Sequence, residues 1–220
     1  MIKAVIFDFD GVVGDTMNDN FIAWEKAFLF YQIEVTPLDY FLLEGMTRFQ
    51  IAYELMKQHQ MLDININELV DRKEQYFAKY NKYKLYPEII DILILLKEND
   101  VNMGLVTGAS KNRIQNTVDK SLLDYFSIII TADDVDKGKP DPEPYVRAIH
   151  ALKLDASQCL VIENAQLGIQ SAKKAGCKCF AIATTLPAQY LDGADEIFSS
   201  HDELLFRIQT MVTNKLLIKD

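Results

Sequence analysis

The chain has 220 residues, 49% of them hydrophobic and 25% charged, which is typical of a globular protein with room for one large domain or two small ones. Its 32 acidic and 23 basic side chains give a formal net charge of −9. Because such a surface repels phosphate backbones and anionic lipids, we expect neither a nucleic-acid nor a membrane partner.

Five short apolar runs have the length and residue types of buried strands. They are residues 4–7, 103–106, 127–130, 159–162 and 179–183. Three stretches with helical length and pattern lie between the later runs, at residues 110–122, 142–152 and 165–175. Gly176 follows the last stretch, where a glycine that ends a helix belongs. The alternation predicts an α/β fold with a doubly wound, mainly parallel sheet.

A further helix is predicted over residues 87–99, apolar almost all round and therefore buried against the sheet. The segment before it is too long for a simple strand–helix loop and carries aromatic and charged residues at helical spacings. We therefore predict a helical cap domain at residues 16–83, inserted into a core domain formed by residues 1–15 and 84–220. Most aromatic residues of the insertion are interpreted as core packing.

Three cysteines provide no disulfide framework, and the N-terminal apolar run reaches Asp8 too soon for a secretory leader. No apolar run approaches the roughly 20 residues needed to span a bilayer. Cys177 and Cys179 lack further ligands for zinc and are interpreted as small buried residues. We expect a cytoplasmic protein and, by default, a monomer.

Polar residues follow the predicted strands where each one ends. Asp8-Phe9-Asp10-Gly11 follows the first, Thr107-Gly108 the second, and Glu163-Asn164 the fourth, while Lys139 lies in a polar loop after the third. In a parallel sheet these ends share one edge, and ligands bind in the crevice there. Carboxylates for a cation and a lysine for an anion suit a metal-bound phosphate.

These motifs resemble those of the haloacid dehalogenase (HAD) superfamily, in the subgroup with a small helical cap that includes β-phosphoglucomutases and sugar-phosphate phosphatases. The segment 8–16 matches the signature D-x-D-G-[TV]-x-x-D-[ST], and Thr107 matches the second motif. Residues 139–142 match the third motif, and 161–164 with the following glycine and alanines resemble the fourth. The four motifs stand in the family's order and cover essentially the whole chain.

The resemblance implies that Asp8 is a nucleophile that forms an aspartyl-phosphate, and that Asp10 is the general acid and base. Simpler roles exist for this segment: Asp8 could begin a turn, and Asp10-Gly11 is also turn chemistry. Asp15-Thr16 fits the family, but capping of a helix accounts for it equally well.

The resemblance also implies a phosphate site and a Mg²⁺ site. Lys139 would neutralise charge in the transition state, although alone it could be a surface lysine. The other groups assigned to phosphate or substrate are Gly11, Thr107, Gly108 and Ser110. The residues assigned to Mg²⁺ are Asp8, Asp10, Glu163 and Asn164. Many relatives carry two acids where this chain has Glu163-Asn164, so we expect weaker Mg²⁺ binding here than in those relatives.

In the predicted cap, Gly45-Met46-Thr47-Arg48 resembles the loop that mutases place over the sugar phosphate, and Arg48 could hold a second anionic group. Lys73 could do likewise, although we interpret it rather as a surface lysine on a helix. Ser110 begins a mutase-like segment. Asn20 stands where the compared β-phosphoglucomutases carry a histidine, and asparagine cannot carry a proton for Asp10. This difference favours hydrolysis.

The sequence thus predicts a magnesium-dependent phosphohydrolase that acts on a small phosphorylated metabolite, such as a sugar or polyol phosphate. A phosphosugar mutase of the β-phosphoglucomutase type is the first alternative. A phosphometabolite-binding protein that keeps the fold without catalysis is the alternative from another class.

Overall fold

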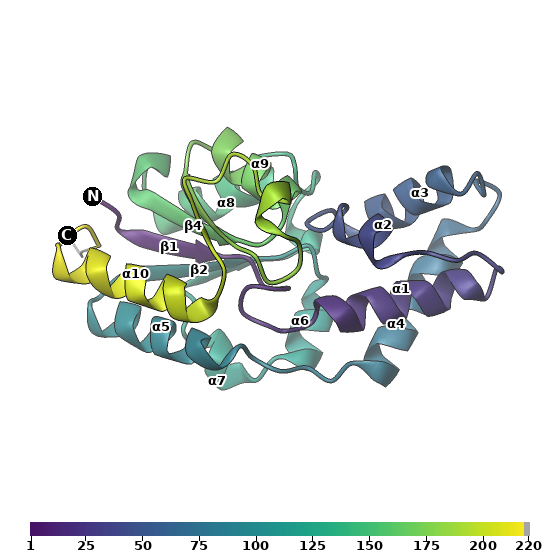
Figure 1. Cartoon of the computed structure of the whole chain (residues 1–220), viewed down its shortest axis with the longest axis horizontal. Helices are drawn as coiled ribbons and strands as arrows, with labels where there is room; N and C mark the ends of the chain where they lie inside the picture. The colour runs from purple at the N-terminus through teal and green to yellow at the C-terminus, as the bar shows by residue number, and fades with distance from the viewer. Residues whose placement is uncertain (218–220) are drawn as a thin grey trace.

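Six parallel strands form the central sheet in the computed structural model, which describes residues 1–217 of the chain (Figure 1). Their order in space is β3-β2-β1-β4-β5-β6. The strands are β1 (Ala4–Phe7), β2 (Asn102–Val106), β3 (Ile128–Ile130), β4 (Cys159–Glu163), β5 (Lys178–Ile182) and β6 (Glu196–Phe198). The predicted α/β class with a parallel sheet is confirmed.

Helices cover both faces of the sheet. One layer contains α5 (Pro87–Glu98), α6 (Lys111–Thr117), α7 (Lys120–Leu123) and α10 (His201–Thr213), and the other contains α8 (Glu143–Leu152) and α9 (Gln166–Lys174). Successive strand residues point to opposite faces: Val5 and Phe7 of β1 pack in the first layer, while Ala4 and Ile6 pack in the second. Within the described residues, three single-turn 3₁₀ helices lie in the connections, at Ala132–Asp134, Ala156–Gln158 and Ala188–Tyr190.

Three details differ from the sequence prediction. The single helix expected at 110–122 is divided into α6 and α7, because Val118 takes an extended conformation. Helix α5 is not buried all round: Ile89 and Leu93 are inaccessible, whereas Ile94 is 39% exposed. Strand β6 and helix α10 were not predicted.

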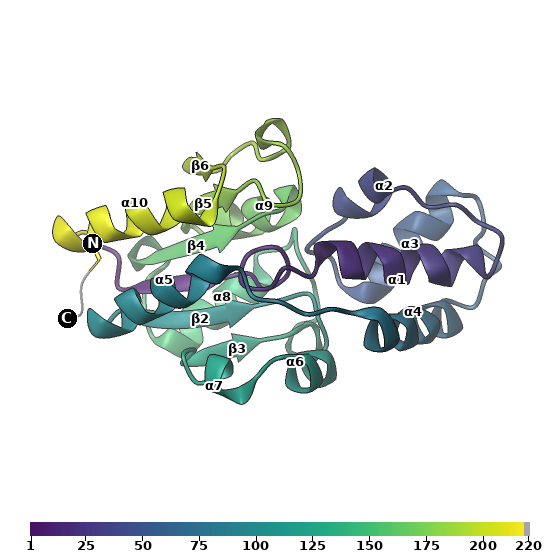
Figure 2. The same ribbon diagram turned by 60° about the horizontal axis from the view of Figure 1, so that its bottom comes forward.

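Four helices between β1 and α5 form a separate bundle at one end of the molecule, beyond the carboxyl ends of the strands (Figure 2). They are α1 (Met17–Leu29), α2 (Pro37–Phe41), α3 (Arg48–Gln58) and α4 (Ile66–Tyr80). Trp24, Phe28 and Leu69 are buried in a hydrophobic core that this bundle has to itself. We call these four helices and their connections the cap. None of the helices described is both long and apolar enough to cross a membrane.

Candidate active site

The carboxyl ends of the central strands bring the predicted polar residues together. Strand β1 pairs with β2 on one side and with β4 on the other. The backbone N–H of Asp8 continues this pairing with the carbonyl of Ile162, at 2.9 Å. Thr107 follows β2, and Glu163 is the last residue of β4. The three side chains are 4% exposed or less, so they form a buried floor below the cap.

Lys139 lies between two buried carboxylates. Its Nζ donates to Oδ1 of Asp8 and, at 2.6 Å, to Oε1 of Glu163. The same Glu163 oxygen accepts the hydroxyl of Tyr145 at 2.6 Å, and Oε2 accepts the backbone N–H groups of Asn164 (3.0 Å) and Ala165 (3.3 Å). Glu163, which the sequence assigned to the metal, therefore already has protein donors on both oxygens and fixes the position of Lys139.

Burial and the charge of the neighbouring partner shift the pKa values of Asp8 and Lys139 in opposite directions. Burial raises the pKa of Asp8 well above its usual value; the charge of Lys139 opposes the rise, and Glu163 adds to it. Burial would lower the pKa of Lys139, but the charges of Asp8 and Glu163 outweigh this effect and raise it. Lys139 therefore keeps its positive charge between the two acidic side chains. Further positive charge near Asp8 would favour the ionised form of Asp8.

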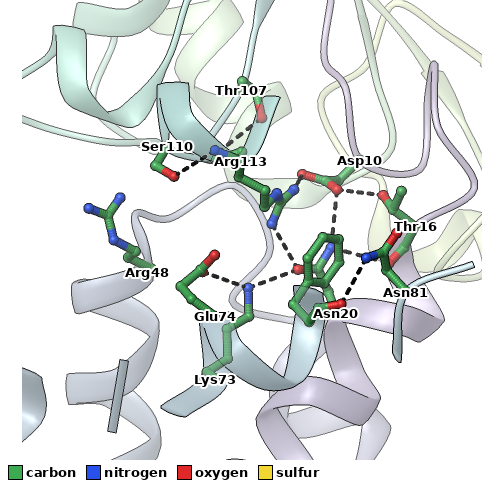
Figure 3. A network of polar contacts seen from close by, with 12 residues as sticks. Asp10, Thr16, Asn20, Arg48, Lys73, Glu74, Asn81, Thr107, Ser110 and Arg113 are labelled. Carbon is green, nitrogen blue, oxygen red and sulfur yellow. Dashed lines mark hydrogen bonds and ion pairs between the residues drawn. The ribbon is translucent and has the colours of Figure 1, made fainter. Parts of the chain in front are cut away.

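Asp10 is held by three donors (Figure 3). Oδ1 accepts the hydroxyl of Thr16 and, at 3.1 Å, the amide of Asn20, while Oδ2 forms an ion pair with Arg113. Thr16 makes no side-chain cap to α1, so the capping role considered from the sequence is replaced by this contact with Asp10. These bonds fix the carboxylate of Asp10 at the boundary between the sheet and the cap.

Arg113 is a site residue that the sequence analysis missed. From α6 it reaches Asp10, donates to Oδ1 of Asn20 at 2.8 Å, and lies over the ring of Phe77 in α4, 4.7 Å from the centroid. The residues it joins are far apart in the chain, and the only sequence signal was its place three residues after Ser110. Arg113 thus connects the sheet domain, the cap and Asp10.

Lys73 is buried rather than exposed, so its interpretation as a surface lysine is wrong. Its side chain is 2% accessible, and Nζ donates to Asn20 and to the carboxylate of Glu74, each at 3.0 Å. Burial lowers the pKa of Lys73, and the charge of Glu74 opposes that change. The ammonium lies beside the rings of Trp24 and Phe77, which contributes cation–π attraction.

The remaining predicted residues lie where the cap meets the sheet domain. Thr107 Oγ1 accepts the backbone N–H of Ala109 at 3.0 Å, and Ser110 begins α6 by accepting the N–H of Arg113 at 3.2 Å. Arg48, at the start of α3, donates to Asp133 at 3.4 Å. These contacts place Arg48 and Ser110 on opposite sides of the same boundary (Figure 3).

Two glycines allow close approach of neighbouring chain segments, one at this boundary and one within the sheet domain. A Cβ on Gly108 would lie 2.8 Å from the backbone carbonyl of Met46 in the cap loop. Gly11 has a φ of +84°, and a Cβ there would lie 2.1 Å from the amide nitrogen of Asn164.

The cavity between cap and sheet domain is only about 20 Å³, room for about one water molecule. A substrate therefore requires the cap or its side chains to move.

Oxygen ligands of the kind that a magnesium ion prefers follow the ends of β1 and β4. Asp8, the backbone carbonyl of Asp10 and the side-chain oxygen of Asn164 are the hard ligands that Mg²⁺ prefers. Asn164 Nδ2 donates to Thr185 at 2.9 Å, whereas its buried Oδ1 has no hydrogen-bond partner in the described part of the chain. Within residues 1–217, no cluster of three or more His, Cys, Asp or Glu side chains could hold a metal by itself, and a magnesium site here would include carbonyl and amide oxygens.

Comparison with known proteins now identifies the family. The sequence model of the haloacid dehalogenase-like hydrolases matches residues 5–182. The chain belongs to this family. It is 30% identical over 216 residues to validoxylamine A 7'-phosphate phosphatase of Streptomyces hygroscopicus subsp. limoneus, covering 93% of this chain and 96% of that protein. It is 28% identical to the β-phosphoglucomutase of Bacillus subtilis (strain 168), covering 94% and 93% respectively.

Solved structures agree with the sequence relatives. The crystal structure of β-phosphoglucomutase from Clostridium difficile superposes with a TM-score of 0.85 at 25% identity, covering 98% of this chain and 99% of that one. The HAD protein is thus an enzyme of the phosphatase and phosphosugar-mutase type that acts on phosphorylated substrates.

Proposed function

We propose that this HAD protein is a magnesium-dependent phosphatase that hydrolyses a small phosphorylated metabolite, a sugar or polyol phosphate, through an aspartyl-phosphate on Asp8. The observation that carries the proposal is that two buried acidic side chains, two residues apart, have different partners. Asp8 contacts the ammonium of Lys139, and Asp10, two residues later, is held by Thr16, Asn20 and Arg113.

In the first step, a carboxylate oxygen of Asp8 attacks phosphorus while the bond from phosphorus to the ester oxygen breaks. Lys139 is close enough to neutralise negative charge on the transferred group. Thr107 and the backbone N–H of Gly108 lie at the end of β2, where they can donate to the phosphoryl oxygens. Asp10 must enter this step protonated; its carboxylic acid gives that proton to the departing oxygen, which leaves as an alcohol.

In the second step, Asp10 accepts a proton from a water molecule that attacks the phosphorus of the aspartyl-phosphate. The bond between phosphorus and Asp8 breaks, phosphate is released and both carboxyl groups return to their initial states. Asp8, the carbonyl of Asp10, Glu163 and Asn164 would hold Mg²⁺, which supplies positive charge to the phosphoryl oxygens when bound.

The phosphatase proposal is favoured over a mutase by Asn20. Its amide bonds to Asp10 at 3.1 Å but cannot take up or release a proton as a histidine could. A mutase remains the second candidate, because the chain is similar to β-phosphoglucomutases over nearly its whole length. In that reaction Asp8 would return the phosphoryl group to a second hydroxyl, and the cap would have to exclude water.

One incubation distinguishes the two reactions. The protein is mixed with β-glucose 1-phosphate, a bisphosphate primer and Mg²⁺, and the products are measured. Free phosphate supports the phosphatase, whereas glucose 6-phosphate supports the mutase. A screen of phosphorylated metabolites then identifies the substrate. If no phosphoester is hydrolysed and Asp8→Asn changes nothing measurable, the non-catalytic binding protein becomes the better account.

A further inference from the structure

Glu44 is a buried acid that the proposed mechanism does not use. It lies in the cap loop between α2 and α3, is 9% exposed, and lines the small cavity that also contains Asp10 and Arg113. Its carboxylate accepts the hydroxyl of Tyr40 at 2.6 Å. Burial, followed by the charge of Asp10, raises the pKa of Glu44 to about 7, while Arg113 and Lys139 oppose the rise.

The basic residues that line this cavity each form an ion pair with an acidic residue. Lys73 pairs with Glu74, Arg113 pairs with Asp10, and Arg48 pairs with Asp133 outside the cavity (Figure 3 shows the first two pairs).

Across residues 1–217, by contrast, Glu44 forms no ion pair, and its hydrogen-bond donor is the neutral phenol of Tyr40. A buried carboxylate without a cation is unfavourable, because the loss of hydration is not repaid by charge attraction. The cavity therefore presents an acid that is in direct contact with none of the cations described.

Glu44 lies next to the proposed phosphate site. A Cβ on the following residue, Gly45, would lie 3.1 Å from the side chain of Lys139. Gly108 and Ser110, at the end of β2 and the start of α6, line the same cavity as Glu44. With phosphorus at Asp8, the alcohol part of the ester would extend from Asp10 into this cavity and meet the Glu44 carboxylate.

We propose that Glu44 determines specificity by binding a protonated amine on the alcohol part of the substrate, so that the preferred esters are amino-alcohol or amino-sugar phosphates. The proposal rests on the proposed phosphatase function and narrows its substrate class. A hydroxyl group would leave the carboxylate without a cation, as Tyr40 does. An ammonium group adds the Coulomb attraction between opposite charges to the hydrogen bond, which a hydroxyl group cannot supply.

Two esters that differ in one group test the proposal. We would measure kcat/KM for 2-aminoethyl phosphate and 2-hydroxyethyl phosphate with Mg²⁺. We expect the amine to be preferred by about tenfold or more, since a close pair of opposite charges in a buried site adds attraction that the hydroxyl group lacks. In the Glu44→Gln variant, which lacks the negative charge, the ratio of kcat/KM for the amine to that for the alcohol should approach one. Glu74→Gln is the matched control: Glu74 lines the same cavity but is already paired with Lys73, so the preference should persist.

Three results would overturn the assignment. They are a wild-type ratio near one, a preference for the amine that survives in Glu44→Gln, or a preference that Glu74→Gln reduces as much as Glu44→Gln does. The wild-type ratio needs no variant to fold. Hydrolysis of p-nitrophenyl phosphate tests the proposed function separately. If that activity is absent, calorimetric binding of the two esters to Asp8→Asn still decides the role of Glu44, since a preference for the amine supports it and equal binding refutes it.

Discussion

Replacing Lys139 with Met removes the ammonium that two buried carboxylates share. Lys139 and Glu163 are each 1% exposed, and their charged atoms are 2.6 Å apart, so solvent screens the pair weakly. Removing one partner of a buried ion pair costs about 3–5 kcal/mol, because the other charge is left uncompensated. We therefore expect Lys139→Met to lower the free energy of unfolding by about 3 kcal/mol or more. Asp8 contributes to this loss, since it contacts the same ammonium.

The assay is urea denaturation of the wild type, Lys139→Met, Glu163→Gln and the double variant. Removing both charges should cost less than the sum of the single changes by roughly 0.5–3 kcal/mol, the range for residues in direct contact. Lys173→Met provides a surface control, because Lys173 and Asp195 are 2.7 Å apart but 39% and 33% exposed. That pair should contribute about 1 kcal/mol or less. Additive single changes, or equal losses for Lys139→Met and Lys173→Met, would refute the reasoning.

Four further outcomes follow from the structure. Asn164→Asp should lower the Mg²⁺ activation constant of turnover by about tenfold, since a carboxylate replaces a neutral donor; an unchanged constant would count against the proposed ligand. Gly108→Ala should reduce kcat/KM by roughly 10–100-fold, because its Cβ would meet the cap-loop backbone at 2.8 Å; steady-state kinetics near wild type would contradict this. Arg113→Met should reduce kcat by about 10–100-fold by releasing Asp10, with partial rescue by Arg113→Lys; a loss confined to KM would argue against positioning. The native thiols should resist iodoacetamide at pH 8 and react in urea, since burial raises the pKa of Cys159 to about 11 and of Cys177 to about 12; labelling of the folded protein, detected by mass spectrometry, would be inconsistent with that burial.

The sheet was predictable because its inner strands are continuous apolar runs. Residues 4–7 and 159–162 were both expected, and each forms or begins a strand. The edge strand β6 has three residues, Glu196–Phe198, of which Ile197 is 42% exposed, so it lacks such a run. Helix α10, which follows β6, leaves Phe206 72% exposed but buries Leu204, Ile208 and Met211. These three residues recur at helical spacing, so the sequence did carry a signal for this helix.

The site was only partly predictable because its motif residues follow strands whereas its other contacts cross the fold. Asp8 and Glu163 could be placed at one edge from the strand order alone. Arg113 meets Asp10 across 103 positions, and Lys73 meets Asn20 across 53. No local pattern distinguishes those two cations from surface residues. Their burial is decided by how α4 and α6 meet at the boundary between cap and sheet domain.

The most direct test of the central claim is to trap the phosphoryl group on Asp8. In the Asp10→Asn variant, p-nitrophenyl phosphate still supplies a good leaving group, but the base that activates water is absent. With Mg²⁺, we predict a burst of one p-nitrophenolate per protein and, after acid quench, one phosphoryl group on the peptide that contains Asp8, measured by mass spectrometry. Steady turnover without a burst, or a phosphoryl group on another residue, would contradict the account.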